Sequence, residues 1–166
     1  QNLSALAHNQ CLLFMGNTRV LISMNVIFEE YPQLFPLFFI GLWSIVCFIL
    51  SKFGGWSYLA KQYPCRESFK GEKSYLRSMK MGLVNYSNCV TVGVNSSELY
   101  LGIMFLFRIG HKPIKVPLVE VTGKKIEGTI LDYVVLSIKK VDIKIPKKLA
   151  DKIVAASNGT WHYGDS

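Results

Sequence analysis

The hydrophobic and polar positions of this chain of 166 residues follow two patterns, one before residue 54 and another after residue 74. Residues 34–50, LFPLFFIGLWSIVCFIL, form an uncharged run. A helix that crosses a bilayer needs about 20 mainly apolar residues, and residues 51–53 extend the run to that length. Pro36 stands in the first turn, where its missing N–H costs little. The pattern therefore predicts a transmembrane helix over residues 34–53.

Two other structures produce a run of this kind, a buried core helix and the apolar region of a signal peptide. A core helix is disfavoured because no polar face repeats at helical spacing along the run. A cleaved signal is disfavoured because Glu29 and Glu30 precede the run and no small-residue cleavage site follows it. Half of the residues are hydrophobic and the mean hydropathy is +0.26, which agrees with a membrane segment.

After residue 74 the pattern changes to short segments in which apolar and polar residues alternate and β-branched residues are frequent. Such segments, separated by turn residues, predict strands. The expected strands are 74–83, 88–94, 99–107, 114–126, 129–139 and 141–146, with Pro117 interrupting the fourth. Residues 146–156 carry apolar positions at helical spacing and predict a C-terminal helix. We therefore expect a mainly β fold over residues 75–156, a small barrel or sandwich with that helix packed on it.

Three further segments complete the expected organisation. Residues 54–74 form a connector, in which Ser57 caps a short helix that ends at Pro64. Residues 157–166 form a flexible, frayed tail. In the N-terminal segment 1–33, Met24 opens a stretch that looks like a natural protein start, so residues 1–23 are interpreted as an upstream extension. A genuine N-terminal segment is the alternative.

The charges lie almost wholly after the apolar run. Of the 19 Lys and Arg residues only Arg19 precedes residue 51, together with Glu29 and Glu30. The positive-inside rule therefore places the C-terminal domain in the cytoplasm, on an inner or plasma membrane. The expected partner is the anionic lipid of the leaflet that faces the domain. A basic chain also suits nucleic acid, but Lys dominates over Arg and no aromatic residues interleave with it, so no nucleic-acid partner is expected.

The cysteines give no indication of a metal site. They form no C-x-x-C pair and have no His at ligand spacing, so no metal is expected. The segments FKGEKS and GKKIEG lack the spacing of a phosphate-binding loop, and no cofactor is expected. Cys47 and Cys89 lie in apolar runs, where they are expected as small buried residues. The four cysteines are enough for two disulfides, although a reducing compartment is the simpler interpretation.

The segment FRIGHKPIKVP, residues 107–117, gathers Arg108, His111, Lys112 and Lys115 beside a glycine and a proline. Basic side chains bind phosphate and carboxylate, so these four residues are the candidate site for an anion, a lipid headgroup or a protein partner. Catalysis by His111 needs an orienting partner and a nucleophile, and no nearby Asp, Ser or Cys is spaced to supply them. No catalytic residue is therefore assigned, and a basic structural turn is the remaining interpretation.

Aromatic residues follow the apolar run directly. Trp56, Tyr58 and Tyr63 are expected at the membrane interface, where amphipathic rings gather. Within the run, Gly41, Trp43 and Ser44 suit contacts with other membrane helices.

Residues 88–156 resemble the pleckstrin-homology (PH) and GRAM superfamily in their layout. The segments that carry this resemblance are NCVTVGVNSSELYL, IKVPLVEVTGKKIEG, YVVLSIKKVDIKI and PKKLADKIVA. It implies a seven-stranded split barrel that is closed by a C-terminal helix and binds lipid or protein. The segments GGWSYLAKQYP, MGLVNYSNCVTVGV and FRIGHKPIKVPLVEV also resemble a group of short, uncharacterised bacterial membrane proteins with one span and a small β-domain. That second resemblance implies an architecture and an origin, and no chemistry.

These expectations favour a single-pass membrane protein whose β-domain is a binding module for anionic lipid headgroups or a membrane protein. A small structural subunit or assembly factor of a membrane complex is the alternative, in which the span makes the contacts. An enzyme that uses His111 is the third candidate.

Overall fold

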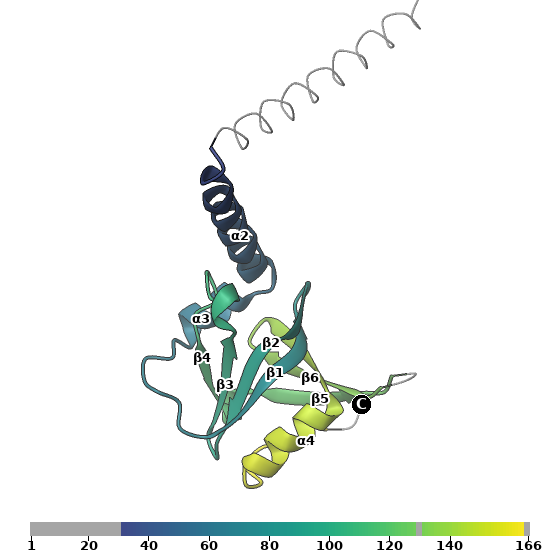
Figure 1. Cartoon of the computed structure of the whole chain (residues 1–166). Coiled ribbons are helices and arrows are strands. Elements are labelled where there is room, and N and C mark those ends of the chain that lie inside the picture. The colour runs from purple at the N-terminus through teal and green to yellow at the C-terminus, as the bar shows by residue number, and fades with distance from the viewer. Residues whose placement is uncertain (1–30, 129–130, 165–166) are drawn as a thin grey trace, which may run out of the picture. The chain divides into compact units, whose positions relative to one another are not determined.

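The computed structural model describes residues 31–128 and 131–164. The chain divides into two compact units, residues 1–44 and 45–166. Helix α2, Leu34–Phe53, begins in the first unit and ends in the second, and the strands all lie in the second (Figure 1). The expectations for residues 1–30, including a start at Met24, lie outside the described residues.

Helix α2 is apolar along most of its length. Its most apolar window has a mean hydropathy of 2.3. Large apolar side chains are exposed along it, among them Leu37, Ile40 and Ile45. In the described part of the chain it is the one helix long and apolar enough to cross a membrane. Lys52 lies in the last turn, where the helix dipole favours a cation.

The second unit is built on one antiparallel sheet of seven strands, which curls into a half-barrel (Figure 1). The strands are β1 (Glu72–Met81), β2 (Val84–Val94), β3 (Glu98–Ile103), β4 (Ile114–Pro117), β5 (Thr122–Ile126), β6 (Tyr133–Ile138) and β7 (Val141–Pro146). Their order in the sheet is β4-β3-β2-β1-β7-β6-β5. The helices are α3 (Trp56–Gln62), α4 (Lys147–Ala156) and the single turns η1 (Phe105–Phe107) and η2 (Leu118–Glu120). The predicted mainly β fold with a C-terminal helix is therefore present, and we call residues 54–164 the β-domain.

The alternation of apolar residues decides which face of the sheet is buried. On β7, Val141, Ile143 and Ile145 are buried whereas Asp142 is exposed, and β6 alternates in the same way. Because successive side chains of a strand point to opposite faces, one face of the curled sheet forms the interior. Helix α4 packs on the sheet (Figure 1). Its buried side chains are Leu149, Ala150 and Ile153.

Both edges of the sheet are covered by other segments. Beside β4 the backbone of residues 63–65 bonds to the strand, with Lys115 N donating to Tyr63 O at 3.1 Å. Beside β5 the C-terminal residues do the same, with Gly164 N donating to Gly123 O at 3.1 Å. Since an unpaired edge is a template for aggregation, these two segments protect the sheet.

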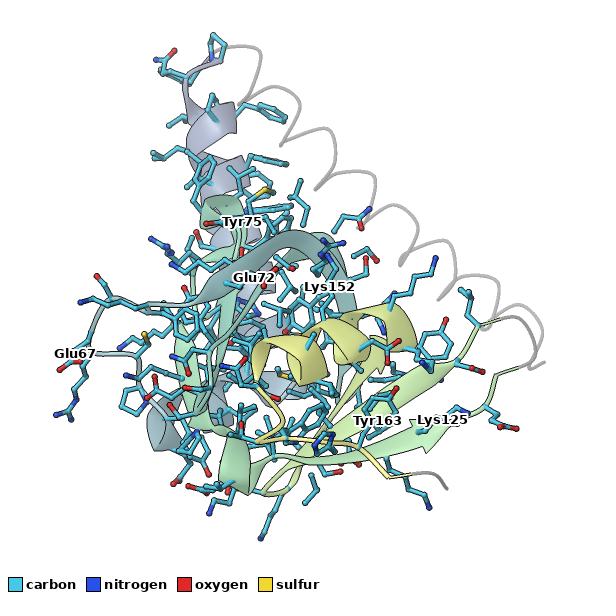
Figure 2. All side chains as sticks on the ribbon, turned by 90° about the horizontal axis from the view of Figure 1, so that it is seen from below. Glu67, Glu72, Tyr75, Lys125, Lys152 and Tyr163 are labelled. Carbon is cyan, nitrogen blue, oxygen red and sulfur yellow. The ribbon has the colours of Figure 1, made fainter. Side chains whose placement is uncertain are left out.

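The expectation of a frayed tail is wrong for residues 157–164. Trp161 is 4% exposed, and its Nε1 donates to Val121 O at 2.7 Å. The hydroxyl of Tyr163 donates to Asp151 of α4 at 2.5 Å. Figure 2 labels Tyr163 close to Lys125 of β5, in agreement with the pairing of the tail with that strand. The segment is ordered because it buries an indole and completes the edge of the sheet.

Several element boundaries also differ from the expectation, and three of these differences change the arrangement of the elements. Residues 114–126 are not one interrupted strand, because Pro117 ends β4 and β5 lies at the opposite edge of the sheet. The strand expected over 99–107 is shorter, and η1 follows it. Helix α3 starts after Gly55, which has a φ of 79°, so Ser57 is not its cap.

Candidate functional site

The loop between β3 and β4, residues 104–113, packs on the last turns of α2. Buried Ser51 of α2 donates through Oγ to Gly110 O at 2.5 Å, and its Oγ lies 2.7 Å from Ser57 Oγ. Gly110 has a φ of 77°, and a Cβ added there would lie 3.3 Å from Phe48 Cα. The positive φ therefore favours glycine at this position, and the close contact places this loop beside the end of α2.

The turn between β1 and β2 approaches the same end of α2. Gly82 has a φ of 54°, and a Cβ added there would lie 3.1 Å from Gly54 O and 3.4 Å from Phe53 O. Leu83 beside it is 81% exposed. The turn 82–83 and the loop 104–113 thus both lie where α2 enters the β-domain. We call them together the α2-proximal end.

His111, one of the residues expected to bind an anion, lies in the interior rather than at the surface. It is 2% exposed, with Nε2 3.0 Å from Tyr86 Oη and Nδ1 3.1 Å from Ile109 O. Burial disfavours the charged ring and lowers the pKa of His111 below its ordinary value. A neutral imidazole with both nitrogens engaged offers no charge to an anion, so His111 is not part of an anion site.

Trp56, expected at the membrane interface, is also an interior residue. It is fully buried, and its Nε1 donates to Lys112 O at 2.8 Å. Its ring centroid lies 5.5 Å from that of Tyr86 and 5.3 Å from that of His111. These three residues form a buried aromatic cluster that supports the loop through Lys112. The interfacial expectation fails for Trp56 because packing in this cluster removes the indole from the surface.

The two tyrosines of the expected interface differ in their surroundings. Tyr58 is 40% exposed on α3, as an interfacial side chain must be. Tyr63 is half-buried, and its hydroxyl donates to Glu120, which also pairs with Lys139 at 2.8 Å. Burial and the Glu120 carboxylate raise the pKa of Tyr63. The Tyr63 hydroxyl is therefore engaged within the β-domain, and Tyr58 alone of the three keeps the exposure that the interfacial role requires.

Lysines from three elements meet at one groove beside the loop. Lys52 comes from the end of α2, Lys61 from α3 and Lys112 from the loop. The groove has a volume of about 390 Å³, and its other lining residues are Phe48, Ser57, Ala60, Pro64 and Gly110. All three lysines are exposed, and in residues 31–128 and 131–164 no acidic side chain lines the groove. We call it the lysine groove, because it presents three ammonium groups without a counter-charge.

The other predicted residues stand outside this groove. Arg108 is exposed at the C-terminal end of η1, and Lys115 lies on β4, where it pairs with Glu98 at 3.2 Å. Lys112 is thus the one predicted residue that lines the groove. Lys52 and Lys61 are not among the predicted residues, because their approach to Lys112 depends on how α3 packs. Their position directly after the apolar run is the signal that points to them, since anionic headgroups lie at that level.

Exposed apolar side chains lie on the same α2-proximal end. Phe105 is 74% exposed, and Leu83, Leu106 and Ile109 are also exposed. Exposed apolar surface of this kind, beside cationic side chains, is typical of sites that contact a membrane or a partner.

Acidification is expected to destabilise the β-domain through His111. Burial lowers the pKa of His111 in the folded state, whereas the unfolded chain titrates near pH 6.5. Below that pH the unfolded state binds more protons than the folded state, so the contribution of His111 to stability is complete above about pH 6.5 and declines as the pH falls through it. Denaturant unfolding of the full chain in micelles between about pH 5 and 8 measures this. A His111→Gln variant should show a flatter profile, and an unchanged slope would contradict the assignment.

No protein family model matches this chain, and no curated protein matches it. Within the described residues, no group of three His, Cys, Asp or Glu side chains is placed to hold a metal ion. Cys47, Cys65 and Cys89 are free thiols. The functional conclusion therefore depends on the geometry of the α2-proximal end.

Proposed function

We propose that this chain is a single-pass membrane protein whose β-domain binds anionic lipid headgroups in the lysine groove. In this account α2 crosses the bilayer, and the groove lies at the headgroup level of the leaflet that faces the β-domain. The domain acts as a binding module that holds a lipid phosphate by charge.

The observation that carries the proposal is the meeting of Lys52, Lys61 and Lys112 at the end of a helix that is long and apolar enough to cross a membrane. A lysine near an anionic leaflet contributes about 1 kcal/mol, so three correspond to roughly 3 kcal/mol, or about a hundredfold in affinity. The contact between Ser51 and Gly110 fixes the loop to α2. The groove is therefore held close to the point where α2 would leave the hydrocarbon core.

The exposed apolar side chains support the same orientation. Phe105, Leu106 and Ile109 on the loop and Leu83 on the turn are all exposed at the α2-proximal end. Side chains of this type enter the boundary between headgroups and acyl chains, where burial contributes about 25 cal/mol per Å² of apolar area. An α2-proximal end that faces the bilayer removes these side chains from water.

Charge and fold supply two further arguments. The excess of Lys and Arg after residue 50 favours a cytoplasmic β-domain. A seven-stranded sheet followed by a C-terminal helix is the arrangement that the resemblance to PH and GRAM domains implies. That superfamily binds lipid or protein, which supports the proposal by analogy of fold alone.

Replacing the three groove lysines with glutamine is expected to remove most of the preference for anionic lipid. The full chain in detergent micelles is titrated with phosphatidylglycerol or phosphatidylcholine, and the bound lipid is counted by native mass spectrometry. The Lys52→Gln/Lys61→Gln/Lys112→Gln variant should lose roughly ten- to a hundredfold in affinity for phosphatidylglycerol, while its affinity for phosphatidylcholine changes little.

The matched control replaces three exposed lysines that do not line the groove, Lys70, Lys124 and Lys140, with glutamine. It therefore changes the net charge by the same amount as the groove variant. This control should keep the affinity of the wild type. Equal losses in the two triple variants would mean that net charge, and not the groove, determines binding. Co-purification of a membrane protein together with equal retention of both lipids would instead favour the structural-subunit alternative.

A further inference from the structure

Strand β1 departs from regular pairing on both sides of Arg77. Its register with β2 shifts between Ser74 and Arg77 and again between Arg77 and Met79. Leu76 has a φ of 52°, a left-handed conformation that bulky side chains rarely adopt, and it is 61% exposed. Backbone strain of this kind persists only where the surrounding structure holds it, and it gathers at functional sites.

A pair of hydrogen bonds across β1 and β2 holds the irregular segment. Ser78 Oγ donates to Asn88 Oδ1 at 2.8 Å and accepts from Asn88 N at 2.9 Å. Asn88 also has a positive φ, 51°. On its other side β1 pairs with β7 only at Lys80 and Met81, so the segment around Arg77 has no strand neighbour there.

The open side of this segment borders a pocket next to α4. The pocket has a volume of about 340 Å³, and its lining residues are Leu76, Arg77, Ser78, Asn88, Pro146, Lys148, Leu149 and Lys152. Three of these residues are cations, and no Asp or Glu from the described residues lines the pocket. Figure 2 labels Lys152 on α4, and Lys148 lies one helical turn before it. Like charges at this spacing repel each other, so the lining favours a bound anion.

The side chain of Arg77 gives a second argument, besides the uncompensated charges of the pocket. Its Nε is buried, and it is the one buried side-chain nitrogen or oxygen in residues 31–128 and 131–164 that has no hydrogen-bond partner. A guanidinium stays charged and offers only donors, so a buried N–H without an acceptor is unfavourable. An anion in the pocket would neutralise the charge of Arg77 together with those of Lys148 and Lys152.

We propose that this pocket binds the phosphate group of a soluble small molecule, such as a phosphate monoester or a diphosphate. The planar guanidinium of Arg77 can bond to two phosphate oxygens. The ammonium groups of Lys148 and Lys152 add two positive charges that balance the negative charge of the phosphate. The volume lies at the lower end of the range for small-molecule sites, about 300–1,000 Å³, so a phosphate leaves room for a small organic group. Leu149 provides an apolar wall for that group.

The pocket is separate from the lysine groove. The two share no lining residue. Arg77 lies five residues before Gly82 at the α2-proximal end, which is at most roughly 17 Å along the chain. This separation favours a ligand from solution over a headgroup of the bilayer in which α2 is proposed to lie.

The test uses the full chain in nanodiscs of phosphatidylcholine, with pyrophosphate as the probe and isothermal titration calorimetry as the readout. The wild type should bind pyrophosphate, and Arg77→Gln should weaken binding by at least about tenfold, because it removes charged donors. The double variant Lys148→Gln/Lys152→Gln should weaken it similarly. It changes only exposed residues of α4, so it provides the same test if Arg77→Gln fails to fold.

Two controls separate this pocket from net charge and from the groove. The Lys70→Gln/Lys124→Gln variant should bind pyrophosphate as the wild type does. The triple variant of the lysine groove removes a separate cationic site, so it should keep the binding event that Arg77→Gln weakens. Absence of binding to the wild type, or equal weakening in the controls, would overturn the proposal. At an ionic strength that screens the charge of the leaflet, nanodiscs that contain phosphatidylglycerol should leave the affinity for pyrophosphate unchanged. A marked loss there would show that lipid competes for the pocket and would overturn the assignment to a soluble ligand.

Discussion

Replacing Trp56 with alanine is expected to destabilise the β-domain by about 3–5 kcal/mol, the usual cost of deleting a buried Trp side chain. Trp56 is fully buried, and its ring packs against Tyr86 and His111. The substitution also removes the donor to Lys112 O, so the loop loses a contact that helps to hold Lys112 at the lysine groove. Denaturant unfolding of the full chain in micelles, followed by near-ultraviolet circular dichroism, measures the loss.

Two further substitutions separate the causes of this effect. Trp56→Phe keeps an aromatic ring but loses the N–H, and we expect a smaller loss of about 1–3 kcal/mol. Tyr58→Ala on the same helix removes an exposed ring, and we expect a change within about 0.5 kcal/mol. A Trp56→Ala variant as stable as Tyr58→Ala would show that the indole lies at the surface, as the sequence alone predicts.

The second large effect is expected at Trp161. Trp161→Ala should also cost about 3–5 kcal/mol, because the indole is buried and donates to Val121 O directly before β5. Its loss should release the segment 157–164 from the edge of the sheet. Hydrogen exchange at the amides of Lys125 and Gly164, which bond across this edge, should then become faster.

His162→Ala is the matched control for Trp161, because His162 is the next residue in the tail and is exposed. We expect its stability to lie within about 0.5 kcal/mol of the wild type. If Trp161→Ala were equally harmless, residues 157–164 would be the frayed tail that their turn-like composition indicates, and the packing described above would be wrong.

Elements that depend on local pattern could be predicted from the sequence. Helix α2 follows from a continuous apolar run, because a segment with no polar face has few other stable arrangements. Strand β7 follows from the alternation of Val141, Ile143 and Ile145, since the period of two is a property of the strand itself. Helix α4 follows from the spacing of Leu149 and Ile153 after Pro146.

Burial of single aromatic residues could not be predicted in this way. Trp56 and His111 are 55 residues apart and meet only because α3 and the β3–β4 loop pack together. An aromatic residue just after an apolar run suits a membrane interface and a domain core equally well. The same holds for Trp161, whose partner Val121 lies 40 residues earlier.

The candidate site was predicted in part. The clustering of basic residues in segment 107–117 identified Lys112. The same cluster also included Lys115, which pairs with Glu98, and His111, which is buried. The groove instead takes Lys52 and Lys61 from other elements. The pocket at Arg77 has no sequence signal at all, because it arises from a register shift in β1 that no local pattern specifies.

The affinity of the unaltered chain for two lipids tests the central claim most directly. Native mass spectrometry of the full chain gives dissociation constants for phosphatidylglycerol and phosphatidylcholine in the same micelles. The lysine groove predicts that phosphatidylglycerol binds at least about tenfold more tightly, and that added salt reduces the difference because exposed ammonium groups are screened. Equal dissociation constants for the two lipids at low salt would contradict it.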